Sequence, residues 1–567
     1  MNIPFLNREI VSFHAAALVI GGAALVSKLL GLMRDRLLAA RFGAGDALDA
    51  YYAAFQLPDL LYTILLLGAA SAAVLPAYLG ARRVDAKTAE RFLGNLLTLF
   101  GATAIAGALV LFALAPELLR LLVPGFDPEK LAMAVGLTRI MALNVLPLGI
   151  AGILASVLQA HQRFIAFALP PIVYNVGIII GILLFTPALG VAGLAWGVVF
   201  GGALQVIVVL PAFFGLGIRY RPRFSLADPA LRQVLATSLP RVLALSFGQL
   251  TLIALAAIAS LFASGSLAAF RLGANLMYVP VGLFGVSYAL AVFPKLSDAS
   301  LARAGEAFTN HFVAGFRTIL FWTLPAAALA MVLRAHIVRV VLGSGVFDWT
   351  DTRLVAAIIA AIAIAVVSES IAPLVLRAFY ALGRTREPLI WNLLSSSLAV
   401  VVALLLSAWF VRAPEVLERI AGVFRIRDIP SPTILAVAFG FALGSAVNAL
   451  MLVLVLRRAV RHEFGIRLRF GTTDLAGMLG AAVLAAVVAW LVLQPFPSLV
   501  ATDTFSGILL QGVVAGVAGM VVYGLILFGQ KNPELFGFWE SVRRRLVTPR
   551  RAPQVFETEK LDGDLSR

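Results

Sequence analysis

Long apolar runs dominate this chain of 567 residues and constrain its fold more than any other feature. A helix needs about 20 mainly apolar residues to cross the hydrocarbon core of a bilayer. Only 13% of the residues are charged, against about 25% in an average soluble protein. The sequence therefore predicts an all-α polytopic membrane protein and excludes a soluble enzyme. The predicted spans number fourteen, at residues 11–31, 50–79, 92–114, 132–158, 165–186, 189–214, 234–263, 266–293, 312–333, 353–381, 388–411, 433–456, 473–494 and 505–529.

Lysine and arginine are distributed unevenly about these spans. The loops and tails on the side of the two termini hold 27 of them, and the opposite loops hold 11. Cytoplasmic loops of membrane proteins carry such an excess, so both termini are predicted to be cytoplasmic. The same asymmetry explains the formal charge of +16 without a nucleic-acid partner. The chain has no cysteine and no P-loop motif, which excludes thiolate metal sites, disulfides and an ATPase of its own.

Two sets of motifs recur along the chain at offsets of 217 to 219 residues. Leu48–Tyr51 is echoed by Leu267–Phe270, and the proline and asparagine at Pro171 and Asn175 return at Pro388 and Asn392. Six spans per unit predict parallel repeats, which in transporters place the substrate path between two lobes. The predicted organisation is an N-terminal lobe at 1–215, a C-terminal lobe at 216–456, two appended spans at 457–530 and a basic tail at 531–567.

Charged residues inside apolar runs are the first candidates for function, because each costs about 2.5–3.5 kcal/mol at the centre of a spanning helix. Seven of the ten found here are basic. A cavity lined by such groups suits an anionic head group, particularly a phosphate or diphosphate bound by guanidinium groups, better than a cationic drug. The ten are Lys28, Arg34, Asp35, Asp49, Arg139, Arg241, Arg271, Arg317, Glu369 and Arg377.

Local pairing is an alternative explanation for four of these charges. Lys28 and Asp35 lie two helical turns apart on one face, and so do Glu369 and Arg377. Each pair could form a structural salt bridge rather than contact a substrate.

Position along the span separates the remaining arginines. Arg139 and Arg317 lie near span ends, where a long side chain can reach the membrane interface. Arg34, Arg241 and Arg271 have no acidic partner in helical register nearby. These three are therefore the strongest candidates for an anion site.

Short motifs along the chain carry a resemblance to a known family. Those of the opening block are Ser27–Asp35, Phe42–Gly45, Leu48–Ala50, Leu57–Leu61 and Gly68–Ser71, and later ones are Gln162–Phe164, Ala195–Gly197, Gly201–Gln205 and Ala378–Tyr380. The opening block resembles the MurJ/MviN family, the bacterial lipid II flippases of the MOP exporter superfamily. The resemblance covers nearly the whole chain and agrees with spans in 6+6+2 order.

The resemblance implies a transporter rather than an enzyme. Such a flippase moves a polyprenyl-diphosphate-linked peptidoglycan precursor, lipid II, from the inner to the outer leaflet of the bacterial inner membrane by alternating access. It implies a cationic central cavity formed by Lys28, Arg34, Asp35 and Asp49, and a lipid-tail groove on the last two spans. It implies no cofactor, coupling to Na⁺ or to the membrane potential, and contact with lipid II, membrane lipids and cell-wall synthesis proteins.

The chain departs from the family pattern at several positions. The paired arginines of span 2 fall on Tyr62 and Thr63, and the nearby glutamate falls on Leu67. The cavity arginine of span 8 falls on Asn275, one turn after Arg271. These losses indicate a divergent member with an altered cation set.

The predicted substrate site therefore combines Lys28, Arg34, Asp35, Asp49, Arg241 and Arg271, supported by Asn275, Glu369 and Arg377, with Asn392 and Ser396 as ligands of a coupling cation. Three other functions stay open at this point: a flippase for another polyprenyl-linked glycan, a MATE-like cation-coupled exporter, and a transport-inactive membrane scaffold. An exporter is expected to rely on embedded carboxylates and to need only twelve spans.

Overall fold

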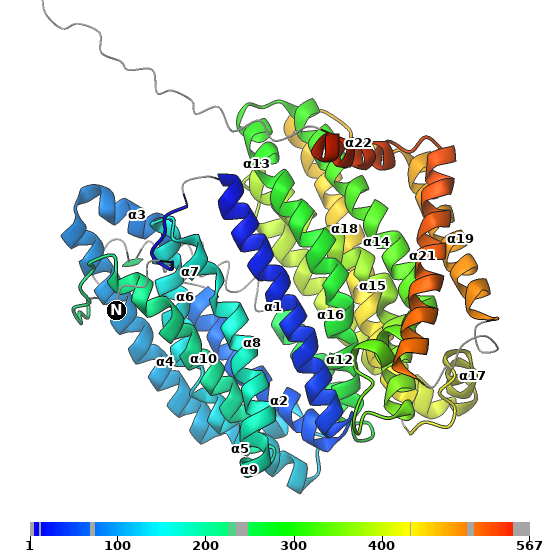
Figure 1. The fold of residues 1–567 in the computed structure, drawn as a ribbon, viewed down its shortest axis with the longest axis horizontal. Helices are drawn as coiled ribbons and strands as arrows, with labels where there is room; N and C mark the ends of the chain where they lie inside the picture. The colour runs from blue at the N-terminus through cyan, green and yellow to red at the C-terminus, as the bar shows by residue number, and fades with distance from the viewer. Residues whose placement is uncertain are drawn as a thin grey trace, which may run out of the picture.

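Helices form two lobes that lie side by side in the computed structural model, which describes residues 5–10, 13–67, 74–225, 228, 231–232, 248–430, 432–495 and 504–547 (Figure 1). The helices of the first lobe are α1 (Phe13–Phe42), α2 (Asp46–Tyr62), α3 (Val74–Val84), α4 (Ala86–Leu122), α5 (Pro128–Ala142), α6 (Val145–Ala160), α7 (Phe164–Ala168), α8 (Pro170–Ile180), α9 (Thr186–Leu189) and α10 (Ala192–Phe214).

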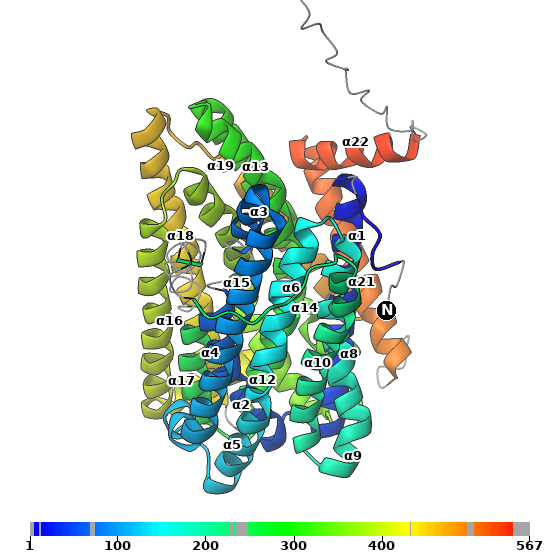
Figure 2. The ribbon, with the colours of Figure 1, turned by 90° about the vertical axis from the view of Figure 1, so that its left-hand side faces the viewer.

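The second lobe and the appended helices follow in chain order. The lobe contains the helix Gly248–Ser260, α12 (Ser266–Pro280), α13 (Ser287–Leu301), α14 (Gly305–Val341), α15 (Trp349–Ala381), α16 (Arg386–Arg412), α17 (Pro414–Phe424) and α18 (Leu435–Phe464). Beyond it come α19 (Thr472–Leu493), α21 (Phe505–Gly529) and α22 (Pro533–Val547). Figure 2 shows the long helices of both lobes running roughly parallel to one another.

Eleven helices in the described part of the chain are long and apolar enough to cross a membrane. The predicted all-α polytopic fold is confirmed. The other three predicted spans coincide with α1, with the α2–α3 pair and with the apolar helix Gly248–Ser260. The predicted count of fourteen therefore fits the helices present.

The helix bounds repeat along the chain as the motifs do. Helices α4 and α14 are each 37 residues long and begin 219 residues apart. Short π-helical segments, Thr63–Leu67 and Val281–Val286, interrupt the second span of each lobe at matching places. Such π-helical turns are rare and occur mostly at functional sites. The second span of each lobe is thus the element to inspect for cargo contacts.

The lobes are joined at one end of the bundle, named here the latch end and made of residues 40–49, 123–128, 260–268 and 342–351. The amide of Val346 donates to the carbonyl of Ala40 at 2.9 Å, and the amide of Ala44 donates to Asp351 Oδ2 at 3.0 Å. Gly345 has a positive φ of 60° and lies directly against the Ala40 carbonyl, where a Cβ would overlap that oxygen. A larger residue at Gly345 would therefore push the lobes apart.

The opposite end is named the basic end and comprises the α3–α4 junction, residues 218–225, the C-terminal end of α18 and α22. Residues 218–225 lie across α4, where the fully buried Asn95 amide both donates to the Ser225 carbonyl at 2.7 Å and accepts from the Ser225 amide at 2.8 Å. Many exposed arginines lie at this end, namely Arg82, Arg83, Arg219, Arg221, Arg223, Arg457, Arg458 and Arg461. The ends thus differ in charge, as the loop asymmetry predicts.

The appended helices are attached to α14 of the second lobe. The Tyr523 hydroxyl of α21 donates to the Phe321 carbonyl at 2.8 Å. Arg317 of α14 forms ion pairs with Asp474 of α19 at 2.9 Å and with Glu534 of α22 at 2.6 Å. Arg317 is therefore the junction of three helices, and the expectation that it reaches the membrane interface stays a prediction. Arg139 lies over the Phe112 ring and donates to its carbonyl at 3.1 Å.

Candidate cargo site between the lobes

Helices α1 and α12 bring the two lobes together in antiparallel register. Asn275 Nδ2 of α12 donates to Asp35 Oδ2 of α1 at 3.2 Å. Two turns earlier on α1, the Lys28 ammonium lies against Gly282, since a Cβ placed on Gly282 would be 3.9 Å from Lys28 Nζ. Five of the eleven predicted residues therefore meet along one interlobe seam: Lys28, Arg34, Asp35, Asn275 and, one turn from Asn275, Arg271.

Arg34 is held by its immediate neighbour in the sequence. Its Nε and Nη2 atoms donate to Asp35 Oδ1 at 3.0 and 2.7 Å, and Nη1 donates to Asn175 Oδ1 at 3.3 Å. The prediction that Arg34 lacks a nearby acidic partner is wrong. Adjacent residues do not normally face each other on a helix, but the long guanidinium bends back to a carboxylate whose residue is 3% exposed.

Asn175 connects α8 to this ion pair and was not selected as a site residue. Its Nδ2 donates to Ser27 Oγ at 3.2 Å and to the Pro171 carbonyl at 3.0 Å, so its Oδ1 is turned toward Arg34. The signal was present in the sequence, because Asn175 belongs to a repeated motif. Arg34 is thus held by Asp35 and Asn175 and is not a free cation.

Two cations at the seam remain without ion pairs. Lys28 is exposed and makes no salt bridge with Asp35, so that predicted pair is not formed among the described residues. Arg271 makes no hydrogen bond or ion pair within the described chain; its electrostatic neighbours are Asp59, Tyr52 and Tyr278. An arginine without a salt bridge inside a membrane protein is expensive and marks a site for an anion.

Tyr52 interacts with charged residues of both lobes. It interacts electrostatically with Asp35 and Arg34 on one side and with Arg271 on the other. Its buried hydroxyl has no hydrogen-bond partner. A buried polar atom in this condition costs free energy unless a ligand or water reaches it. The hydroxyl is therefore available to a bound head group.

Asp59 of span 2 is an acidic neighbour of Arg271 and was not predicted as a site residue. It interacts electrostatically with Arg271 without an ion pair within 4 Å. The signal that could have found it is its position, because it is a carboxylate within the predicted span 50–79. The family's span-2 arginine positions, Tyr62 and Thr63, lie one turn further along, at the junction with the π-helical segment.

Asp49 lies at the latch end and not beside the cargo-site cations. Its carboxylate accepts from the amides of Gly265 at 2.8 Å and Ala268 at 2.7 Å, at the N-terminus of α12. Lys130 Nζ, at 2.6 Å, forms an ion pair with it and also contacts Asp46. Asp49 therefore does not lie with the other residues predicted for the cavity. The carboxylate of Asp49, on the first lobe, is stabilised by the positive end of the helix dipole of α12, on the second lobe.

Glu369 and Arg377 do not pair with each other. Glu369 Oε1 accepts from Ser445 Oγ at 2.7 Å, and Arg377 Nη1 donates back to the Pro373 carbonyl of its own helix at 3.2 Å. The predicted local ion pair is therefore wrong. Glu369 of α15 thus has no cationic partner among the described residues.

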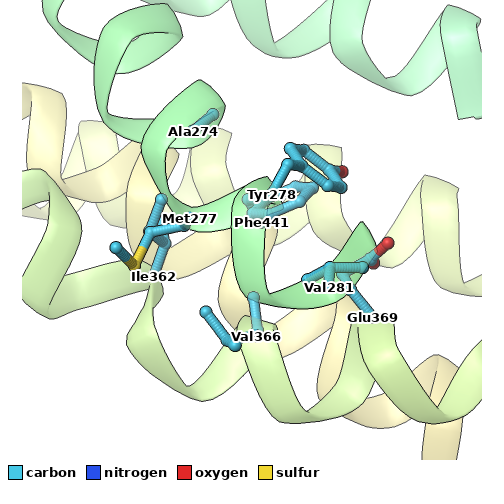
Figure 3. Close-up of a pocket in the computed structure, with 9 residues that line it drawn as sticks. Ala274, Met277, Tyr278, Val281, Ile362, Val366, Glu369 and Phe441 are labelled. Atoms are coloured by element: carbon cyan, nitrogen blue, oxygen red, sulfur yellow. The ribbon is translucent and has the colours of Figure 1, made fainter. Parts of the chain in front are cut away.

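Glu369 borders two cavities inside the second lobe. Figure 3 shows the Tyr278 hydroxyl and the Glu369 carboxylate pointing to the same side, away from apolar Met277 and Val366. On the polar side a cavity of about 350 Å³ opens between α12, α15, α16 and α18. Tyr278 lines it and is also an electrostatic neighbour of Arg271. Tyr278 is thus an electrostatic neighbour of both the Glu369 carboxylate and Arg271.

The predicted cation ligands fall in this cavity. Asn392 and Ser396 of α16 line it together with Ser445 and Asn448 of α18, and the buried Asn448 Oδ1 has no hydrogen-bond partner. Hydroxyl and amide oxygens are ligands that hard cations accept. The role of Asn392 and Ser396 stays a prediction. Arg241 lies outside the described residues.

A family model described as "Lipid II flippase MurJ" matches residues 38–510 of the chain. The chain belongs to the lipid II flippase MurJ family. This MurJ-family chain is 27% identical over 542 residues to a "Probable lipid II flippase MurJ" of Rhizobium meliloti (strain 1021), covering 93% of this chain and 95% of that protein. It is 28% identical to the "Lipid II flippase MurJ" of Burkholderia cenocepacia over 67% of this chain and 75% of the other. The match is to transporters, not enzymes.

Solved structures agree on the MurJ fold. A "Lipid II flippase MurJ, inward closed conformation" superposes with a TM-score of 0.70 over 91% of this chain and 100% of that one, at 19% identity. A multidrug MATE transporter of the MOP superfamily, in an inward-facing conformation, gives 0.60 over 79% of this chain and 98% of that one, at 14% identity. Likeness at such identities shows the fold alone, so the MATE match does not favour the drug-exporter alternative.

Proposed function

We propose that this protein moves lipid II from the inner to the outer leaflet of the bacterial inner membrane by alternating access. The observation that carries the proposal is the family match over residues 38–510. The geometry supports it, because two unpaired cations from opposite lobes, Lys28 and Arg271, face the same seam. Cations of that kind suit the diphosphate of a polyprenyl-linked glycan.

The basic end faces the cytoplasm in this proposal, and both termini are cytoplasmic. The excess of lysine and arginine at that end supports the orientation. The latch end then faces the outside, and the hydrogen bonds that join the lobes there close the outer path. In this orientation the cargo enters from the cytoplasmic leaflet.

The two lobes divide the binding of the head group between them. Lys28 and Arg271 contact the diphosphate oxygens, and the Tyr52 hydroxyl donates to them. The Arg34–Asp35 pair keeps α1 and α12 in register through Asn275 and contributes net charge close to zero. Binding therefore screens the repulsion between Lys28 and Arg271 and draws the lobes together on the cytoplasmic side.

Opening to the outside requires separation of the latch end. The bonds from Gly265 and Ala268 to Asp49 must then break, while the ion pair between Asp49 and Lys130 stays within the first lobe. The polyprenyl tail lies along α19 and α21, which extend the second lobe. Na⁺ at Asn392 and Ser396, or the membrane potential, drives the cycle, and cell-wall synthesis proteins supply and consume the cargo.

Complementation of a strain depleted of its own lipid II flippase tests the proposal. The parent protein should restore growth and cell shape. An Arg271→Ala variant should fail although it accumulates in the membrane, and an Arg139→Ala variant, altered at an arginine outside the seam, should succeed. Failure of the parent protein at normal membrane levels would refute lipid II as the cargo.

A further inference from the structure

Helix α22 lies crosswise to the spans at the basic end, where the views in Figures 1 and 2 agree. Only Gln530–Asn532 separate it from α21, so its first turn is at the boundary of the membrane. The buried Asn532 accepts from the amides of Glu534 and Leu535 at 3.1 and 3.3 Å and fixes the turn between the two helices. The sequence predicts only a basic tail here.

The first turns of α22 pack on the second lobe. Glu534 is paired with Arg317, and Leu535 joins the apolar core that surrounds α14. The Phe538 ring lies 5.2 Å from Trp322, edge to face. These contacts fix which side of α22 is turned toward the membrane-spanning helices.

Trp539 lies on the same side of α22 but has no protein to cover it. It follows Leu535 by four residues, which places the two on one helical face. Nevertheless, 67% of Trp539 is exposed, and so is 42% of Phe536. Tryptophan is enriched at the membrane interface, where its ring sits among the head groups. The uncovered ring is therefore available to lipid head groups.

Arginines follow the aromatic residues directly. Arg543, Arg544 and Arg545 are consecutive in the sequence, Arg550 and Arg551 come soon after, and the Arg543 side chain is exposed. Arg543 follows Trp539 by four residues and so shares its face of α22. Aromatic and basic residues together at the end of a span are the pattern of a helix that lies in the plane of a membrane surface. Clustered basic residues next to a span attract anionic lipids.

We propose that α22 is a membrane-surface helix that binds the head groups of anionic phospholipids, with Trp539 inserted among the lipids and the arginine run that begins at Arg543 supplying the positive charge. The charge of the arginines and the direct continuation from a spanning helix favour a lipid surface over a protein partner. This site is separate from the cargo seam, and it holds whether or not lipid II is the cargo.

Spin labelling of the full-length protein tests the proposal without background, since the chain has no cysteine. One variant is Trp539→Cys, and the matched control is Gly537→Cys, which lies on the opposite face and where an added side chain meets open space. Each labelled protein is reconstituted in vesicles of phosphatidylcholine alone or of phosphatidylcholine with phosphatidylglycerol in equal amounts. Collisions with oxygen report lipid, and collisions with a water-soluble nickel chelate report water.

The label at position 539 should collide with oxygen in the vesicles that contain phosphatidylglycerol, and the label at 537 should collide with the chelate in both. Replacing Arg543, Arg544 and Arg545 with glutamine should shift the equilibrium at position 539 toward water about a hundredfold, because each basic residue contributes about a fivefold preference for an anionic surface. Equal access of the chelate to 539 and 537 would overturn the proposal, and so would burial of 539 that ignores phosphatidylglycerol.

Discussion

Replacing Asp49 with asparagine should weaken the closure of the latch end while leaving the fold intact. The carboxylate accepts one amide on each oxygen, from Gly265 and Ala268. Asparagine has a single acceptor oxygen, so one of the two amides must face an NH₂ group and lose its bond. A hydrogen bond to a charged group contributes about 1.5–3 kcal/mol, and its loss should shift the equilibrium toward the outward-open state about ten- to hundredfold.

The matched control for this change is Asp127→Asn. Asp127 is also a carboxylate of the latch end and is exposed, but the hydrogen bonds that it accepts come from the amides of Glu129 and Lys130, within the first lobe. Asparagine caps a helix about as well as aspartate, so the Asp127 variant should leave the equilibrium in place.

Pairs of spin labels on the two lobes measure the effect. Leu189→Cys and Trp349→Cys place labels at exposed sites, one on each lobe, near the latch end. Dipolar spectroscopy on Asp49→Asn should show a new population at longer distance that is absent from the parent and from Asp127→Asn. If the distance distributions of all three proteins coincide, the carboxylate does not close the outer path and the mechanism is wrong at this step.

Three further expectations follow from the seam and the appended helices. Arg271→Ala should lower transport of a polyprenyl-diphosphate sugar in proteoliposomes about ten- to hundredfold per folded molecule. Arg34→Ala should also lower thermal stability, because it removes the cation paired with the buried Asp35 carboxylate, and equal stability losses in the two variants would contradict this distinction. Arg317→Ala should cost about 3 kcal/mol and release α19–α22 to protease before the lobes unfold, and uniform proteolysis would count against it. Reporter fusions after residues 225 and 464 should both report the cytoplasm, and either one reporting the outside would refute the orientation.

Hydropathy predicted the helices of this fold well because the bilayer imposes one length on nearly all of them. The spans 92–114 and 312–333 lie inside α4 and α14, which are much longer. A hydrophobic window detects only the part of a helix that contacts lipid. It also passed over α22, whose arginines lower its mean hydropathy although the helix is amphipathic.

The site was predicted in composition but not in its pairings. Helical spacing favoured Lys28 with Asp35, yet the structure pairs Asp35 with Arg34 and leaves Lys28 free. Spacing rules apply to an isolated helix, where no second lobe competes. Asn275 reaches Asp35 from 240 residues away and fixes the carboxylate where Arg34 can approach it. Such a choice between neighbours depends on contacts that only the assembled lobes provide.

Asp49 shows the same dependence over a longer distance. Its partners, Lys130 and the amides of the α12 N-terminus, lie outside any local pattern. The sequence identified it as a costly buried charge, which is correct, but that cost is compensated by closure of the lobes rather than by cargo.

The junction at Arg317 also determines which parts of the transporter travel together. Because α14, α19 and α22 meet on this one guanidinium, and Tyr523 adds a second tie to α14, the appended helices must follow every rotation of the second lobe. The first lobe contributes Lys28 to the head-group seam but holds none of these ties. A lipid tail on α19 and α21 would therefore move with the second lobe, while its diphosphate contacts both lobes. Each rocking step then bends the cargo at the joint between head and tail, so tail length and stiffness become determinants of the transport rate.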